Sequence, residues 1–296
     1  MLKVFSQVVL TSLTACALCA CGGGGDAAPN VASAGTPSSH AQAEDDENAG
    51  VPAGYTLVWA EEFNGDGLPD SSKWSYDTEA NATGWFNNEL QYYAAGRLEN
   101  SRISNGELII TARNEALTSA PDYGGQAYTS ARLITRGKAS WTYGFFEIRA
   151  KLPCGQGTWP AIWMLGANND AWPGNGEIDI MEQVGMKPTE ITGTVHMAAT
   201  AGTPGIGGAT QIADACTNFH NYQLTWTEDK LVIGVDNAPY FTYANPGKGK
   251  ASWPYDSPQY LILNLAIGGE MAGLVTDDSI FPRQMEVEYV RVYQKQ

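Results

Sequence analysis

The sequence has few basic residues and few of the residues that build metal or nucleophile sites. Its 296 residues include 17 Lys and Arg against 32 Asp and Glu, a formal net charge of −15. Nucleic acids and anionic membrane surfaces are bound through Lys and Arg, so this balance argues against both as partners and favours a neutral substrate over a sulfated one. The one CxxC pair, Cys16 and Cys19, lies within the first 20 residues, and none is present in residues 53–296, which argues against a zinc site there. The absence of a GxSxG motif and the presence of only three His argue against a serine hydrolase.

Sustained helical periodicity is also missing. Segments of strand length alternate or run apolar, and turns rich in Gly, Asn, Asp and Pro separate them. With 43% hydrophobic residues, the chain is long enough for one domain with a large core. The pattern predicts an all-β fold in which two antiparallel sheets pack as a sandwich or jelly roll. The expected strands cover residues 55–63, 106–113, 128–136, 143–152, 222–226, 230–236, 260–268 and 285–293.

The N-terminus lacks an apolar run long enough to span a bilayer. Lys3 is followed by an apolar stretch over residues 8–18, and the sequence LCAC then ends at Cys21. This resembles a bacterial lipoprotein signal, which implies that residues 1–20 are a signal peptide and that Cys21 is acylated. An ordinary secretory signal cut nearby is the alternative. Residue 22 is Gly rather than Asp, which by resemblance to such lipoproteins favours sorting to an outer membrane, so we expect an exported protein that is anchored there or is extracellular.

Residues 21–52 have the composition of a flexible linker. They are rich in Gly, Ala, Ser, Pro and acidic residues and cannot bury a core, which leaves residues 53–296 as the folded domain. Only Cys154 and Cys216 of the five cysteines fall in this domain. In an oxidising compartment they most simply form one disulfide, and two buried free thiols are the alternative.

The stretch GEIDIMEQ places three carboxylates along one short apolar run. Successive side chains of a strand alternate between faces, so Glu177 and Asp179 point the same way, whereas Glu182 has the wrong parity. One extra residue at Ile180 or Met181, a β-bulge, would bring all three acids onto one face. The carboxyl groups of Glu177 and Glu182 would then be roughly 5 to 6 Å apart, the spacing of a retaining glycosidase. Crowding also raises the pKa of at least one of the acids, as a general acid requires.

Acids on a strand can instead form a solvated sheet edge that blocks aggregation. The surrounding sequence argues against this reading, because it holds far more aromatic surface than a solvated edge needs, and aromatic rings stack on the apolar faces of sugars. The neighbouring indoles are those of Trp85, Trp141, Trp159, Trp163 and Trp172.

Four longer stretches resemble glycoside hydrolase family 16, in its laminarinase-like branch of endo-β-1,3-glucanases. They are GWFNNELQYY, YGFFEIRAKLPCGQGTWPAIWMLG, WPGNGEIDIMEQVG and the closing LILNLAIGG with VEYVRVY. The resemblance covers roughly residues 54–294 and implies a β-jelly roll whose concave sheet forms a glycan-binding cleft. It also implies that Glu177 is the nucleophile, Glu182 the general acid/base, and Asp179 an assisting acid that hydrogen-bonds the nucleophile.

The same resemblance implies a set of substrate-binding residues. Indoles at three positions match sugar-stacking sites, His196 matches a histidine beside the acid/base, and three polar residues match the lining of the subsites for the non-reducing end. The indoles are Trp159, Trp163 and Trp172, and the polar residues are Asn87, Glu89 and Arg132.

The sequence departs from the family pattern at two places. It reads GGEMAG, with Glu270 and Met271, where many relatives have GGNW or GGDW, so the resemblance does not extend to one aromatic wall of the cleft. It also has Glu288 where relatives often have the Asp of a structural calcium site, with Glu62 near the other end of the domain. A longer acid can still coordinate calcium, so Glu62 and Glu288 are candidate calcium ligands.

These observations predict a monomeric enzyme that hydrolyses internal linkages of β-1,3-glucan with retention and needs no cofactor for catalysis. Mixed-linkage β-glucan or agar-type galactan hydrolysis within the same family is the alternative, although the extra residue Met181 argues against the typical mixed-linkage branches. A non-catalytic glucan-binding surface lipoprotein is a third reading. The presence of both Glu177 and Glu182 argues against it, because a pure binder does not need two like charges held together.

Overall fold

The computed structural model describes residues 50–168 and 170–296. The expected signal peptide over residues 1–20, the expected acylation site Cys21 and the expected linker as far as residue 49 lie outside this part of the chain. None of the helices in the described ranges is long and apolar enough to cross a membrane.

The larger of two sheets has ten strands. Eight of them follow one another in the order β15-β14-β13-β8-β17-β5-β6-β3, while β1 pairs with β17 and β4 with β5. Its strands are β1 (Tyr55–Glu61), β3 (Gln91–Tyr93), β4 (Ser101–Ser104), β5 (Glu107–Asn114), β6 (Tyr128–Ser130), β8 (Gly144–Lys151), β13 (His220–Trp226), β14 (Lys230–Val235), β15 (Ala238–Ala244) and β17 (Arg283–Lys295).

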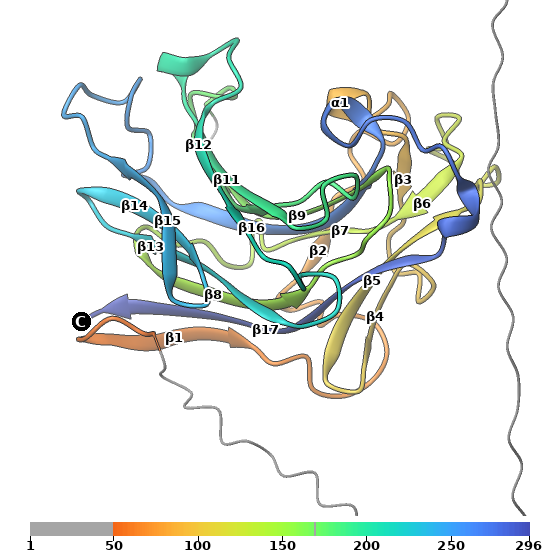
Figure 1. The fold of residues 1–296 in the computed structure, drawn as a ribbon, viewed down its shortest axis with the longest axis horizontal. Helices are drawn as coiled ribbons and strands as arrows, with labels where there is room; N and C mark the ends of the chain where they lie inside the picture. Colours follow the sequence, from red (N-terminus) through yellow and green to blue (C-terminus); the bar gives the residue numbers. More distant parts are fainter. Residues whose placement is uncertain (1–49, 169) are drawn as a thin grey trace, which may run out of the picture. The chain divides into compact units, whose positions relative to one another are not determined.

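The second sheet has seven strands in the order β12-β11-β10-β9-β16-β7-β2. They are β2 (Ser75–Tyr76), β7 (Arg132–Ile134), β9 (Thr158–Gly166), β10 (Glu177–Glu182), β11 (Glu190–His196), β12 (Ile206–Gln211) and β16 (Gln259–Ile267). The helical segments are single turns: α1 (Gly269–Ala272) and the 3-10 helices η1 (Phe86–Asn88), η2 (Ala198–Thr200) and η3 (Asp278–Ile280). The seven-stranded sheet lies over the ten-stranded one as a second layer (Figure 1).

One hydrophobic core fills the space between the two layers. Ile162 and Leu263 enter it from the seven-stranded sheet, and Phe146 and Val292 enter it from the ten-stranded sheet, all four with no exposed surface. Fully burying a side chain of this size stabilises the fold by about 1.5 to 3 kcal/mol. The alternation of the strands leaves the other face of the seven-stranded sheet free for polar and aromatic side chains.

The expected antiparallel sandwich is present, although the expected strands omitted β9, β11, β12 and β15. Two further details differ. First, the single strand expected over residues 128–136 is wrong, because the chain leaves the larger sheet after β6 and enters the smaller one as β7. The buried Ala131 lies between the two strands. Second, β3 and β6 pair in parallel, whereas every other strand pair in the described ranges is antiparallel.

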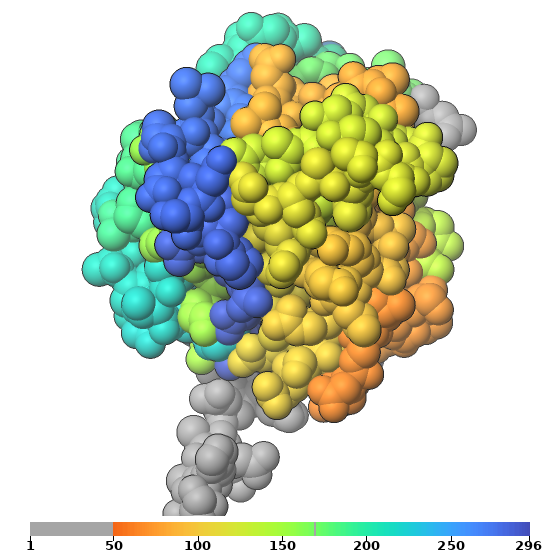
Figure 2. Space-filling view, turned by 90° about the vertical axis from the view of Figure 1, so that its right-hand side faces the viewer, coloured from red at the N-terminus to blue at the C-terminus, as the bar shows by residue number. Residues whose placement is uncertain are grey.

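The segment that carries α1 and η3 packs against β6. The hydroxyl of Tyr128 donates a hydrogen bond to a carboxyl oxygen of Asp278 over 2.6 Å, and the ring of Phe281 lies 5.2 Å from the ring of Tyr128. Figure 2 shows this segment in blue beside the yellow and olive segments from the first half of the domain. These contacts fix the segment of α1 and η3, late in the chain, next to β6, which comes from the first half of the domain.

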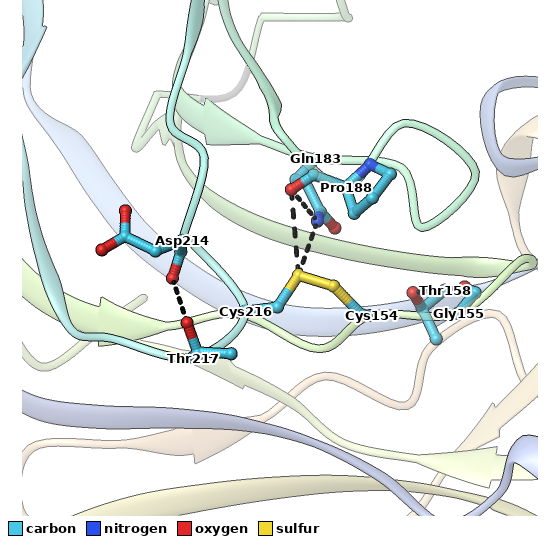
Figure 3. The surroundings of a disulfide bond; sticks show 8 residues. All are labelled: Cys154, Gly155, Thr158, Gln183, Pro188, Asp214, Cys216 and Thr217. Atoms are coloured by element: carbon cyan, nitrogen blue, oxygen red, sulfur yellow. Dashed lines mark hydrogen bonds between the residues drawn. A yellow bond between two sulfur atoms is a disulfide. The ribbon is translucent and has the colours of Figure 1, made fainter. Parts of the chain in front are cut away.

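A disulfide joins Cys154, in the loop after β8, to Cys216, in the loop before β13 (Figure 3). The two Cα atoms are 5.7 Å apart, within the range that a disulfide requires. Of the two arrangements that the sequence left open, the structure has the bonded one.

Candidate active site

Strand β10 presents its three acids on one face because it contains a bulge. Against β9 its register shifts between Asp179 and Met181. Ile180 and Met181 are both fully buried in the core between the sheets, so two successive side chains point inward. Glu182 therefore returns to the face that Glu177 and Asp179 occupy. The bulge that the odd spacing predicts is confirmed.

His196 completes a compact group with two of the acids. It pairs with Glu177 across β10 and β11, and its Nε2 lies 3.3 Å from a carboxyl oxygen of Asp179. The described ranges contain one group of three His, Cys, Asp or Glu residues whose potential metal-ligand atoms lie within 4.8 Å of one another, and it consists of Glu177, Asp179 and His196. The buried hydroxyl of Tyr255 donates hydrogen bonds to the carbonyl oxygens of His196 at 2.9 Å and Glu177 at 3.3 Å, and so links β10 to β11.

Burial is the largest cause that raises the pKa of each of the three acids. It brings the pKa of Glu177 to about 8, and the negative charge of Asp179 adds to the effect. It brings the pKa of Glu182 to about 7, while the hydrogen bond from Trp159 acts in the opposite direction. Burial and the charge of Glu182 raise the pKa of Asp179 well above its ordinary value. The cluster therefore holds protons near neutral pH, as a general acid needs.

Two indoles donate hydrogen bonds to the outer acids. Trp159 Nε1 donates to a carboxyl oxygen of Glu182 over 3.0 Å, and Trp172 Nε1 donates to a carboxyl oxygen of Glu177 over 2.5 Å. Trp172 is 57% exposed and its ring lies 6.0 Å from that of His196, so it forms an open aromatic wall beside the acids. Trp159, in contrast, is nearly buried and lies beside Glu182.

Trp163 and Arg132 form a second group on the same sheet face. The guanidinium of Arg132 lies 4.7 Å from the ring of Trp163 and 5.0 Å from that of Trp85, which places it between two indoles. Its Nε lies 3.0 Å from a carboxyl oxygen of Asp77, and both charged side chains are nearly buried. Asn264 accepts a hydrogen bond from Trp163 Nε1 over 2.7 Å. The packing and the ion pair fix the orientation of these side chains.

Asn87 and Glu89 lie in and just after η1, next to α1. Asn87 Nδ2 donates a hydrogen bond to Glu89 over 3.4 Å, and burial raises the pKa of Glu89. Asn88 donates to Glu270 over 3.1 Å and thereby links η1 to α1. The loop that departs from the family pattern is thus anchored at Glu270 to the segment of Asn87 and Glu89.

Met271 lines a pocket beside Glu182. The pocket has a volume of about 230 Å³ and is also lined by Met186, Lys187 and Thr192. Both methionine side chains are exposed. Met271 stands in the sequence where many relatives have the Trp of an aromatic wall, so a flexible thioether lines the pocket at that position.

Glu62 and Glu288 are each bound to a different arginine. Arg291 donates two hydrogen bonds to Glu62, at 2.9 and 3.0 Å, and Arg149 donates one to Glu288. The arginines already neutralise both carboxylates, which does not favour them as ligands of one calcium ion. Calcium binding at these residues stays a prediction.

Three residues that position the site were not singled out from the sequence. They are Tyr255, which holds the backbone under Glu177, and Asn264 and Asp77, which orient Trp163 and Arg132. No local motif marks them, because each acts on residues far away in the sequence. A polar residue in an otherwise apolar buried strand, as Asn264 is in LILNLAI, is the one signal that was available.

Known proteins resemble this chain in sequence and in fold. A profile of the family described as glycosyl hydrolases family 16 matches residues 88–291. A β-glucanase from Rhodothermus marinus is 48% identical over 251 residues, which are 81% of this chain and 85% of that protein.

Two solved structures extend the comparison. A non-specific endo-β-1,3(4)-glucanase superposes with a TM-score of 0.80 at 55% identity, over 83% of this chain and 93% of that chain. A laminarinase from Rhodothermus marinus superposes with a TM-score of 0.74 at 47% identity, over 81% of this chain and 97% of that chain. The chain therefore belongs to glycosyl hydrolases family 16.

Proposed function

We propose that the protein hydrolyses internal β-1,3 linkages of a glucan with retention of configuration, with Glu177 as the nucleophile and Glu182 as the acid/base. The observation that carries the proposal is the bulge in β10, which turns Glu177, Asp179 and Glu182 to one face beside the indoles of Trp159 and Trp172. The relatives described as β-glucanase, laminarinase and endo-β-1,3(4)-glucanase support the choice of substrate.

The chemistry follows in two steps. Glu177 attacks the anomeric carbon while Glu182 gives its proton to the leaving oxygen, so the glycosidic bond breaks as an ester to Glu177 forms. Glu182, now a carboxylate, then takes a proton from a water molecule that attacks the ester. Glu177 must be ionised to attack, so the acidic limb of the pH profile of kcat/KM reports its ionisation.

Arg132 lies across the strands from the acids in the register of the sheet, which supports an extended binding site. Glu182 pairs with Ala161 on β9, Ala161 with Asn264 on β16, and Asn264 with Arg132 on β7. Three strand spacings of about 4.8 Å separate Glu182 from Arg132 by roughly 14 Å. A chain of several sugars that crosses the strands would contact the acids and Arg132 at the same time.

Hydrolysis of mixed-linkage β-glucan is the second candidate. It is favoured by the 55% identity to a structure described as a non-specific endo-β-1,3(4)-glucanase. Product analysis on laminarin, lichenan, agarose and carrageenan in parallel distinguishes the candidates. Cleavage of laminarin into oligosaccharides supports the proposal, comparable rates on lichenan favour the second candidate, and cleavage of agarose alone contradicts both.

Azide rescue tests the two catalytic roles. With a dinitrophenyl β-glycoside of laminaribiose and azide, Glu177→Ala is expected to yield an α-glycosyl azide, because azide replaces the missing nucleophile. Glu182→Ala is expected to yield the β-anomer, because azide attacks the glycosyl enzyme. Proton NMR of the products decides between them, and the same anomer from both variants would show that the roles are misassigned.

We also propose that the protein is exported and acylated at Cys21, on the strength of the LCAC sequence alone. Expression of the full chain with radiolabelled palmitate tests this. Label in the intact protein and its loss in Cys21→Ser supports acylation, whereas unlabelled protein in the medium supports ordinary secretion.

A further inference from the structure

The disulfide lies at the start of the strand that supplies an indole donor to the acid/base. Cys154 is four residues before Thr158, the first residue of β9, and Trp159 follows. The loop between them is tight, because both the backbone N–H and the hydroxyl of Thr158 donate to the carbonyl oxygen of Gly155, at 3.1 and 2.9 Å. A displacement at Cys154 would thus move Trp159, whose indole N–H binds Glu182.

The other half of the disulfide contacts the residue that follows the acid/base. Gln183 is 1% exposed, and its Nε2 donates to the carbonyl oxygen of Pro188 at 3.0 Å and contacts Cys216 Sγ at 3.7 Å. Figure 3 shows the Gln183 side chain pointing at the sulfur, with Pro188 beside it. Cys216 therefore packs against Gln183, the residue that follows the last residue of β10.

The two segments that carry these contacts also touch through their backbones. The N–H of Gly185 donates to the carbonyl oxygen of Thr158 over 2.8 Å. A Cβ at Gly185 would lie 1.8 Å from the carbonyl oxygen of Gly155, so no side chain fits between the segments. The loop after Cys154 and the end of β10 are therefore packed in direct backbone contact.

We propose that Gln183 and the Cys154–Cys216 disulfide are positioning elements for acid catalysis, which hold Glu182 and its donor Trp159 in the geometry that protonates the leaving group. The proposal rests on the proposed function, because it takes Glu182 to be the acid/base. Neither element touches the substrate in this scheme. A misplacement of about 1 Å at a catalytic group is enough to lower a rate by about a hundredfold.

The test compares two substrates that differ in their need for the acid. Laminarin has an alkoxide leaving group that must be protonated, whereas the dinitrophenolate of a dinitrophenyl β-glycoside of laminaribiose leaves unaided. We expect Gln183→Met, which keeps the disulfide, and the double variant Cys154→Ser with Cys216→Ser to lose at least about tenfold in kcat/KM on laminarin. On the activated glycoside both should stay within about twofold of the wild type.

Reduction of the wild type supplies a second route to the same state. Both cysteines are half-buried, so dithiothreitol can reach the disulfide bond. Dithiothreitol is oxidised to a cyclic disulfide as the protein disulfide is reduced to two cysteine thiols. The laminarin rate should fall and should return on reoxidation. Thr217→Ala is the matched control, because Thr217 lies next to Cys216 but its exposed hydroxyl donates only to the carbonyl oxygen of Asp214. It should change neither rate.

Equal losses on both substrates would show a merely structural role and overturn the proposal, and so would unchanged rates in Gln183→Met and in the reduced wild type. If the double variant does not fold, these last two measurements decide. The variant Glu182→Gln distinguishes a failure of this proposal from a failure of the proposed function on which it rests. If that variant keeps its activity on laminarin, the assignment of the acid itself is wrong.

Discussion

The indole N–H of Trp159 donates a hydrogen bond to the Glu182 carboxyl group over 3.0 Å, from the strand next to the acid. This bond lowers the pKa of Glu182, whereas burial raises it, and the result is a pKa of about 7. The donor stabilises the charged form of the acid, and the apolar surroundings destabilise it. The balance between the two sets the pH above which the acid no longer carries its proton.

Replacement of Trp159 by Phe removes this donor and keeps an aromatic ring. The pKa of Glu182 should rise, so the basic limb of the pH profile of kcat/KM on laminarin should move to higher pH. Trp74→Phe is the control, because the buried Trp74 N–H has no hydrogen-bond partner within the described ranges. A basic limb that stays in place or moves to lower pH in Trp159→Phe would contradict the prediction.

Replacement of Asp179 by Asn should move the acidic limb. The charge of Asp179 is the second cause, after burial, of the raised pKa of Glu177. Without that charge Glu177 ionises at lower pH, so the acidic limb of kcat/KM should shift downward. The same profile measured for Asp256→Asn, an acid that binds Trp253 away from the cluster, should be unchanged. An upward shift in Asp179→Asn would refute the electrostatic argument.

Glu182→Gln should stabilise the fold at neutral pH while it removes activity. The folded pKa of Glu182 is about 7 against an ordinary value of 4.5, so the stability that it contributes is fully present below pH 4.5 and is lost as pH rises through 7. The neutral Gln escapes this loss and still accepts from Trp159. The free energy of unfolding should therefore be equal in both proteins near pH 4 and higher in the variant by about 3 kcal/mol near pH 8. Urea unfolding at both pH values measures it, with the exposed Glu228→Gln as control.

Asp77→Ala should destabilise the protein more than the loss of a surface ion pair would. The variant leaves the guanidinium of Arg132 nearly buried and without the carboxylate that neutralises its charge. We expect this to lower the free energy of unfolding by about 3 kcal/mol. The loosened Arg132 should also raise KM for long glucans more than it lowers kcat, because it acts in binding. Glu79→Gln, which breaks the exposed pair with Arg136, should cost less than about 1 kcal/mol. Similar losses in the two variants would contradict the role of burial.

The sequence by itself determined the features that depend on neighbouring residues. The alternation of apolar residues predicts most of the long strands, because the side-chain period of a strand is local. The bulge in β10 is equally local. A sequence separation of five positions cannot keep Glu177 and Glu182 on one face of a regular strand, and two adjacent apolar residues, Ile180 and Met181, can both turn to the core.

Only the tertiary structure decided which distant residues share a layer. The run over residues 128–136 looks like one strand, but its halves serve different sheets, because the chain crosses between layers at Ala131. The support of Glu177 by Tyr255 and the contact of Gln183 with Cys216 likewise join segments that no spacing relates. The physical reason is that strand pairing and core packing bring such residues together across loops of any length, whereas a sequence pattern reports only on neighbours along the chain.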